Sequence, residues 1–195
     1  MQIKGLHHVS ALTAHAAENY RFYTDVMGLR LIKKTVNQDD VSVYHLFYGD
    51  EKGNPGTELT FFEIPMAGQT REGVNSISAT SLRVPSDAAL QYWIKPWDQS
   101  PVPAEYGIVG LGPVHLTVQD ASLTAAVLTE LLGFRQKGTY PAFVAGQPDV
   151  LVFESGEGGS GSEVHVEERN DLPIERPGRG SVHHVAFRVD NEEEL

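Results

Sequence analysis

The sequence has no cysteine and little positive charge. Without cysteine, disulfide bonds, thiolate metal sites and a cysteine nucleophile are excluded. Its 15 lysine and arginine residues are outnumbered by 26 aspartate and glutamate residues, so the formal net charge is −11. Because this charge repels phosphate groups, we expect neither nucleic acid nor an anionic membrane as a partner.

Long apolar runs are also missing, since none approaches the roughly 20 residues that a membrane-spanning helix needs. The start of the chain, MQIKGLHHVS, lacks the basic stretch and apolar segment of a signal peptide, so we expect a soluble, cytoplasmic protein. Hydrophobic residues still make up 41% of the 195 residues, which is enough for a hydrophobic core. This length predicts one domain or two small ones.

A short apolar run that leads into a polar or turn-forming stretch occurs four times, as is typical of half-buried strands. The four copies are HVSALTA (8–14), ATSLRVPS (79–86), PVHLTVQD (113–120) and HVAFRVD (184–190). After the first and third copies comes the pattern of an amphipathic helix. Each of these helices is followed by a glycine, Gly28 or Gly133, which suits a left-handed helix cap.

Three further strand-like runs follow each of these two helices. They cover residues 29–37, 41–50 and 57–65 in the first copy and 134–145, 149–155 and 162–168 in the third. The alternation of strand and helix patterns therefore predicts an α+β fold of tandem β-α-β-β-β units.

The spacing of the units is uneven. They start at positions 8, 79, 113 and 184, so two steps of 71 residues flank one of 34. We predict a complete unit 1 (1–72), a truncated unit 2 with a linker (73–106), a complete unit 3 (107–176) and the start of a truncated unit 4 (177–195). Because sheets that lack strands are poorly stabilised, about 37 residues are expected to be absent near Lys95 and Pro96. A natural half-unit is the alternative.

Two histidines occupy the same position of the repeat. The first-strand positions are His8, Ala79, Pro113 and His184. Neutral imidazole is the commonest metal ligand, and equivalent strand positions can face each other across a pseudo-twofold axis. We therefore predict that His8 and His184 bind a metal ion, with an inert interface pair as the alternative.

The remaining histidines fit the repeat less well. His7 and His183 are expected on the opposite strand face, because strand side chains alternate, and His15 is expected to be an exposed loop or cap residue. His115 lies two residues further along its strand than the metal-ligand position. His165 and Glu167 are interpreted as part of a solvated strand face.

The sequence resembles the vicinal oxygen chelate superfamily, which includes glyoxalase I, bleomycin-resistance proteins and type I extradiol dioxygenases. The resemblance rests first on GLHHVSALTAHAAENYRFYTDVMGLRL and VHHVAFRV. The stretches VNQDDVSVYHLFYGDEKGNPGTELTFF and PVPAEYGIVGLGPVHLTV are similar to bacterial ring-cleaving dioxygenases of the hydroquinone-detoxification type. This resemblance implies that the units pair into open, barrel-like mixed sheets around one divalent metal.

The resemblance also implies a ligand set. Dioxygenases of this kind hold Fe(II) with two histidines and one glutamate, and His8 and His184 match the two histidines; Mn, Zn or Ni would be other candidate ions. The glutamate belongs to the last strand of unit 4 and is expected beyond Leu195. Glu58 and Glu63, on the last strand of unit 1, are weak substitutes for this ligand and are interpreted instead as exposed edge-strand carboxylates.

The function implied is ring cleavage of a hydroquinone- or catechol-like aromatic with O₂ by an Fe(II)-dependent, extradiol-type dioxygenase. His45 is our candidate for the acid/base residue, with a packed strand residue as the alternative. Tyr44 and Tyr48 are expected to pack in the core, with contact to an aromatic substrate as the alternative. A glyoxalase-type lyase or isomerase and a metal-free ligand-binding resistance protein are the alternative functions. A homodimer is left open.

Overall fold

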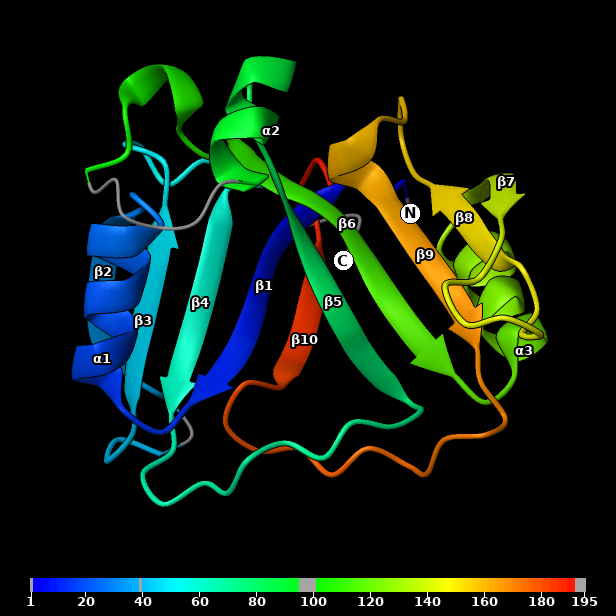
Figure 1. Cartoon of the computed structure of the whole chain (residues 1–195), viewed down its shortest axis with the longest axis horizontal. Coiled ribbons are helices and arrows are strands. Elements are labelled where there is room, and N and C mark those ends of the chain that lie inside the picture. Colours follow the sequence, from blue (N-terminus) through cyan, green and yellow to red (C-terminus); the bar gives the residue numbers. More distant parts are fainter. Residues whose placement is uncertain (1, 39, 95–100, 192–195) are drawn as a thin grey trace.

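Two mixed β-sheets lie side by side in the computed structural model, which describes residues 2–38, 40–94 and 101–191 (Figure 1). Within these residues each sheet has five strands. The order is β10-β1-β4-β3-β2 in the first sheet and β5-β6-β9-β8-β7 in the second. Neither sheet closes on itself, so the predicted α+β class with open sheets is confirmed.

The first sheet holds the elements of the first repeat and the last strand of the described chain. Its elements are β1 (Leu6–Thr13), α1 (Ala16–Arg21, continued by a π-helical turn at Phe22–Val26), β2 (Arg30–Val36), β3 (Tyr44–Gly49), β4 (Glu58–Glu63) and β10 (Val182–Phe187). The three strand-like runs after the first helix are thus confirmed as strands. Gly28 follows the π-helical turn at φ 66°, which is the left-handed conformation expected of it.

The second sheet repeats this pattern. Its elements are β5 (Ser76–Arg83), α2 (Asp87–Ile94), β6 (Gly110–Val118), α3 (Ala121–Ala126, continued by a π-helical turn at Val127–Leu131), β7 (Arg135–Tyr140), β8 (Val150–Glu154) and β9 (Glu163–Glu168), with short 3-10 turns at Ala104–Tyr106 and Ser160–Ser162. The gap predicted near Lys95 and Pro96 lies outside the described residues. None of the helices in the described ranges is both long and apolar enough to cross a bilayer.

One contact recurs at the same place in both copies. The backbone N–H of Ala16 donates to Glu63 at 2.8 Å, and the backbone N–H of Ala121 donates to Glu168 at 3.0 Å. In each copy a carboxylate from the last strand therefore satisfies an N–H of the first helical turn, which has no partner within the helix. Our interpretation of Glu63 as an exposed edge carboxylate was wrong, because it holds α1 against its own strand.

Strand β1 is an inner strand of the first sheet, between β10 and β4. It pairs with β4 in parallel and with β10 in antiparallel orientation, so residues from the two ends of the described chain become neighbours. Because β4 lies between β1 and β3, it is an inner strand. In the second sheet, β6 pairs with β9 in parallel and with β5 in antiparallel orientation.

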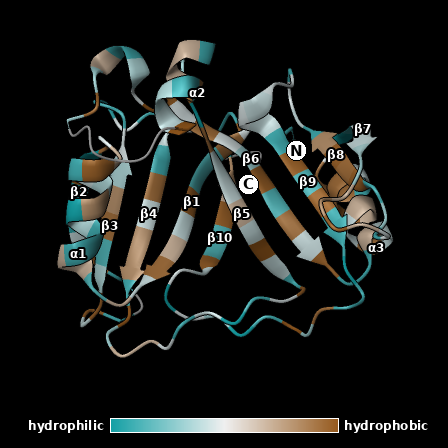
Figure 2. Cartoon of the chain, viewed as in Figure 1, coloured by the Kyte–Doolittle hydropathy of each residue, from teal (hydrophilic) through white to brown (hydrophobic). Residues whose placement is uncertain are grey.

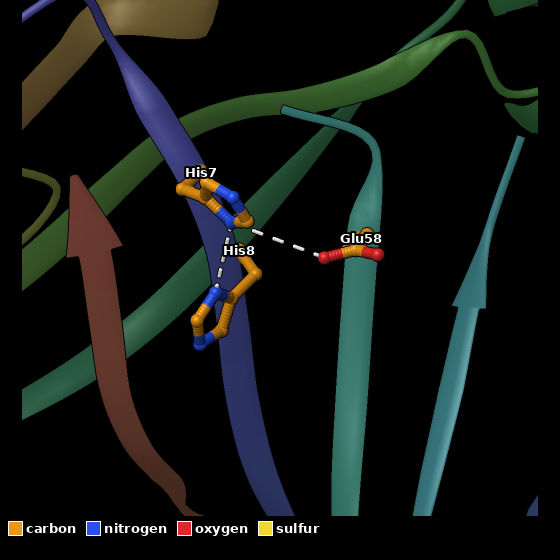
Figure 3. A group of neighbouring side chains, drawn as sticks. All are labelled: His7, His8 and Glu58. Carbon is orange, nitrogen blue, oxygen red and sulfur yellow. Dashed lines mark hydrogen bonds and ion pairs between the residues drawn. The ribbon is translucent and has the colours of Figure 1, made fainter. Parts of the chain in front are cut away.

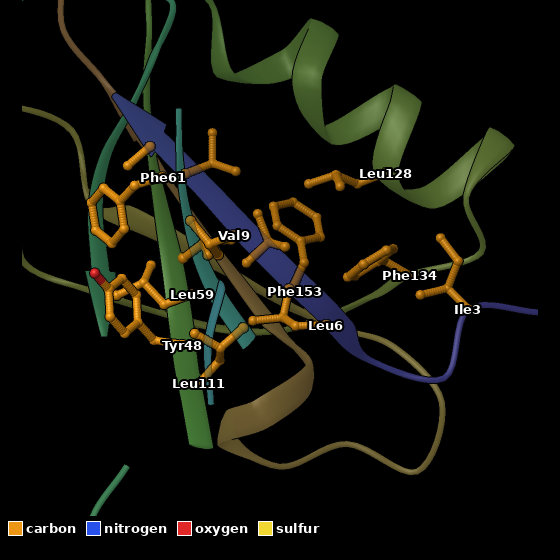
Figure 4. Close-up of a cluster of buried hydrophobic side chains, with 14 of the residues drawn as sticks. Ile3, Leu6, Val9, Tyr48, Leu59, Phe61, Leu111, Leu128, Phe134 and Phe153 are labelled. Atoms are coloured by element: carbon orange, nitrogen blue, oxygen red, sulfur yellow. The ribbon is translucent and has the colours of Figure 1, made fainter. Parts of the chain in front are cut away.

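A single hydrophobic cluster joins the two sheets (Figure 4). It contains Val9 and Tyr48 from the first sheet with Val114 and Phe153 from the second, and all four side chains are fully buried. Tyr48 donates a hydrogen bond from its hydroxyl to Asn19 at 2.8 Å, so its predicted core position is confirmed. The same prediction was wrong for Tyr44, which is 44% exposed.

Two long connections run between the sheets and carry mostly hydrophilic or neutral residues (Figure 2). They cover residues 64–75 and 169–181. Isolated bridges hold them together, among them Gln69 with Arg179 and Val74 with Ile174. These connections fix the first sheet relative to the second along one end of the strands.

Candidate functional site

The imidazoles of His8 and His184 face each other across the β1–β10 pair. Their Nε2 atoms are 3.1 Å apart. Two nitrogens that each bind one ion at about 2.1 Å, at about a right angle, are about 3.0 Å apart. The separation and the chemistry of the two donor atoms therefore fit one shared metal ion.

Both imidazoles are held in the neutral form that a metal requires. Burial, together with the neighbouring His184, His7 and His45, lowers the pKa of His8 to about 4. The pKa of His184 is also lowered, first by burial and then by His183. At neutral pH the two side chains are thus uncharged, and each can offer the lone pair of one ring nitrogen to a metal ion.

The histidines that precede this pair do not point away from it, so our prediction for His7 and His183 was wrong. The Nδ1 atom of His7 lies 3.0 Å from that of His8, and the Nδ1 atom of His183 lies 2.8 Å from that of His184. The register of β1 against β10 skips His7 on one strand and His183 on the other. Each is therefore the extra residue of a bulge, which interrupts the alternation of side chains.

Glu58 brings a carboxylate to the side of His8 on which His7 lies (Figure 3). It lies opposite His8 on the inner strand β4, and its side chain is 19% exposed. Its Oε2 atom is 3.9 Å from Nδ1 of His7, and within the described ranges one ligand atom each from His7, His8 and Glu58 lie within 4.8 Å of one another. Burial raises the pKa of Glu58. The prediction of an exposed edge-strand carboxylate was wrong for this residue too.

His45 lies on β3 with its ring between two phenylalanines. The ring centroids of Phe47 and Phe62 are each 4.0 Å from that of His45. Its Nε2 atom is 3.0 Å from the hydroxyl of Thr60. Burial, together with His184 and Lys33, lowers the pKa of His45 to about 4. The ring is thus packed, as one interpretation had it, and its pKa is coupled to His184 of the histidine pair. Its acid/base role stays a prediction.

The second sheet carries a separate polar cluster. His115 is 3.4 Å from Glu167, and His165 contacts both Tyr140 and Glu163. Glu167 is only 8% exposed, so the expectation of a solvated strand face was wrong. The reason is its place in the wall of a cavity of about 820 Å³ that lies between this sheet and β4. The cluster belongs to the other sheet, apart from His8 and His184.

The surroundings of the histidine pair were only partly predicted from the sequence. Glu58 was considered as a weak substitute for the glutamate ligand and set aside, because its place opposite His8 depends on the parallel pairing of β4 with β1. The buried hydroxyls of Ser10 and Thr60 gave no signal. The bulged histidines did leave a trace, since the tripeptide HHV occurs at both 7–9 and 183–185.

With this fold and site in view, comparison with known proteins defines the class. The model of the Glyoxalase/Bleomycin resistance protein/Dioxygenase superfamily matches residues 5–85. A crystal structure of glyoxalase I from Zea mays superposes with a TM-score of 0.64 at 12% identity, over 94% of this chain and 73% of that one, which shows a shared fold. The chain belongs to this superfamily.

Within the superfamily it belongs to the family of ring-cleaving dioxygenases. It is 47% identical over 239 residues to "Putative ring-cleaving dioxygenase MhqA" of Bacillus subtilis (strain 168), a match that covers 100% of this chain and 75% of that protein. It is 26% identical to "Chlorohydroquinone/hydroquinone 1,2-dioxygenase" of Sphingobium indicum, over 96% of this chain and 71% of that protein. The crystal structure of a "putative dioxygenase" from Bacillus subtilis superposes with a TM-score of 0.84 at 28% identity, over 98% of this chain and 72% of that one.

Proposed function

We propose that this protein is an Fe(II)-dependent, extradiol-type dioxygenase that cleaves the ring of hydroquinone- or catechol-like aromatics with O₂. The observation that carries the proposal is the facing pair of neutral imidazoles, 3.1 Å apart, in a chain of the ring-cleaving dioxygenase family. The name of the Sphingobium relative supports a hydroquinone as substrate. Mn, Zn and Ni are the ions against which Fe(II) has to be compared.

In this proposal His8 and His184 hold the ion through their Nε2 atoms. Glu58 has a carboxylate oxygen within 4.8 Å of ligand atoms of His7 and His8, so it brings a negative charge close to one of the two ligands. When bound, Fe(II) supplies the redox and Lewis-acid chemistry that lets a dihydroxylated aromatic react with O₂.

In this proposal His45 transfers protons to and from the substrate, and the neighbouring aromatic side chains provide an apolar environment. The ring of Phe62 stacks on His45 and lies 6.3 Å from the ring of His184, so it forms an apolar wall between the base and the metal ligands. A neutral His45 accepts a proton from a substrate hydroxyl and returns it to the product, as a general base and acid does. The apolar wall keeps bulk water away from the reacting groups.

The test is oxygen uptake after anaerobic reconstitution with Fe(II). We expect uptake with methylhydroquinone or catechol and none without the aromatic. The same preparation is offered the hemithioacetal that glyoxalase I uses, with Mn, Zn and Ni in parallel samples. No oxygen uptake, together with turnover of the hemithioacetal, would overturn the proposal.

We also propose that unit 2 (73–106) is shortened relative to the family, between α2 and β6, and that unit 4 (177–195) is likewise only begun. The supporting observation is that the match to MhqA spans 239 residues, which exceeds the 195 residues of this chain by 44. That excess is close to the approximately 37 residues that the repeat spacing leaves out of unit 2.

A further inference from the structure

Two buried hydroxyls connect His45 to the strand that carries His8. The Oγ1 atom of Thr60 lies 3.0 Å from Nε2 of His45 and 2.6 Å from Oγ of Ser10. Ser10 is 0% exposed and Thr60 is 1% exposed. Since water does not reach these atoms, each hydrogen bond is hard to replace, and loss of one leaves its partner unsatisfied.

The sheet fixes the three strands on which this chain of contacts runs. Thr60 of β4 lies opposite Ser10 of β1, and Ser10 in turn lies opposite His184 of β10. His45 approaches from β3, on the other side of β4. The two hydroxyls therefore lie in one row across the sheet, between the ring of His45 and the strand of His184.

The geometry restricts how the protons are placed. A hydroxyl donates one hydrogen bond, and Thr60 has two neighbours, Ser10 and His45. If Thr60 donates to Ser10, then Nε2–H of His45 donates to Thr60, and Nδ1 of His45 keeps a free lone pair. If Ser10 donates instead, Thr60 donates to Nε2, and the proton of His45 sits on Nδ1.

Only the first arrangement leaves a ring nitrogen of His45 free to accept a proton, as the proposed base role requires. We propose that Thr60, supported by Ser10, is a positioning residue that fixes the orientation of His45 and holds its proton on Nε2, so that Nδ1 is the nitrogen that accepts a proton. This inference rests on the proposed function, because it assigns the direction from which His45 serves the substrate. The stacked ring of Phe62 restrains the plane of the imidazole, and the hydroxyl pair restrains its rotation within that plane. In a catalytic triad, a carboxylate that accepts a hydrogen bond from one ring nitrogen likewise holds the histidine in one tautomer.

The first test reads the tautomer directly and needs no turnover. The full chain is labelled with ¹⁵N-histidine, and its imidazole spectra are recorded metal-free and loaded with diamagnetic Zn(II). A His45→Gln variant assigns the signals. We expect Nε2–H at His45 in the wild type and in Thr60→Ser, which keeps the hydroxyl, and a mixed or Nδ1–H form in Thr60→Val.

The second test uses the Fe(II)-loaded enzyme. Thr60→Val should lower kcat at least about tenfold, while KM stays within about threefold and iron content is unchanged, because general-base catalysis is lost without loss of binding. Thr60→Ser should restore kcat. The matched control is Thr117→Val, which removes a hydroxyl that is equally buried, at 4% exposure, and donates to Ser78 at 2.7 Å in the other sheet.

The inference is overturned if Thr60→Val keeps the Nε2–H form of His45, if Thr60→Ser behaves like Thr60→Val, or if Thr117→Val lowers kcat equally. A wild-type enzyme that consumes no oxygen with any aromatic would defeat the proposed function instead. In that case the tautomer spectra alone decide whether Thr60 positions His45.

Discussion

Two facing imidazoles make His8 and His184 the side chains on which metal binding depends. We expect His8→Ala and His184→Ala each to abolish stoichiometric metal binding, because one remaining imidazole cannot hold the ion alone. His115→Ala is the control, since His115 lies on the other sheet. Metal content after dialysis, measured by atomic emission, checks this prediction. Full iron occupancy in both His8 and His184 variants would disprove the ligand assignment.

The charge of Glu58 should raise the metal affinity of the site without being required for metal binding. In Glu58→Gln we expect stoichiometric metal with an affinity lowered about tenfold, because outer-sphere partners of a metal site typically contribute tenfold to a hundredfold. Competition with a chelator at fixed pH gives the dissociation constant. If binding is lost as completely as in His184→Ala, Glu58 is itself a ligand and the prediction is wrong.

The pH dependence of stability should report the burial of His115. Burial lowers its pKa in the folded protein, although Glu167 opposes the shift. Below about pH 6.5 the unfolded chain therefore binds a proton that the folded chain does not, so stability is lost as the pH falls. We expect the free energy of unfolding to fall more from about pH 7.5 to about pH 5.5 in the wild type than in His115→Gln. Urea unfolding at the two pH values measures both, and equal falls would contradict the prediction.

The histidine pair could be predicted from the sequence because the repeat makes the positions of His8 and His184 equivalent. Their neighbours could not. Whether Glu58 lies near His8 depends on how β4 pairs with β1. The approach of His7 and His183 depends on bulges, and the repeated HHV tripeptide alone does not distinguish a bulge from a regular strand.

The sequence predicted the strands and helices better than it predicted the surroundings of the histidine pair. The runs at 29–37, 41–50 and 57–65 became β2, β3 and β4, because alternating side chains and strong β-forming residues agree there. The π-helical turns at Phe22–Val26 and Val127–Leu131 were not predicted, since one extra residue in a helix leaves its apolar face almost unchanged. Burial of the β9 carboxylates was also missed, because it comes from the facing sheet.

The end of the first helix should depend on the conformation of Gly28. It has φ 66°, and a Cβ placed there would lie 3.1 Å from Cβ of Val102. Gly28→Ala should therefore lower the free energy of unfolding by about 1–2 kcal/mol, the cost of a left-handed residue with a side chain. In Gly68→Ala, where a Cβ meets nothing within 4 Å, we expect no destabilisation and at most about 1 kcal/mol of gain. Chemical unfolding curves compare the two, and equal midpoints would refute the prediction.

At the scale of the whole molecule, the first sheet combines the strands of unit 1 with β10, and β5 is one of the two end strands of the second sheet within the described residues. An end strand leaves backbone hydrogen-bonding groups without a strand partner on one side. The family member MhqA matches over 44 more residues than this chain contains. If unit 2 is shortened as proposed, those residues in the relative include strands that would cover this edge.

A chimera tests whether added strands stabilise the molecule at the edge of β5. The segment of MhqA that has no counterpart here is inserted between Ile94 and Pro101, replacing residues 95–100. Strands added beside β5 bury apolar surface and pair its free edge, so a gain of about 2 kcal/mol should raise Tm by roughly 4–8 °C for a chain of this size. The matched control carries a Gly/Ser linker of equal length, which should leave Tm unchanged or lower it, because a longer loop costs closure entropy. Calorimetry measures both. A chimera no more stable than the linker control would mean that β5 needs no further strands and that the short unit 2 is complete as it stands.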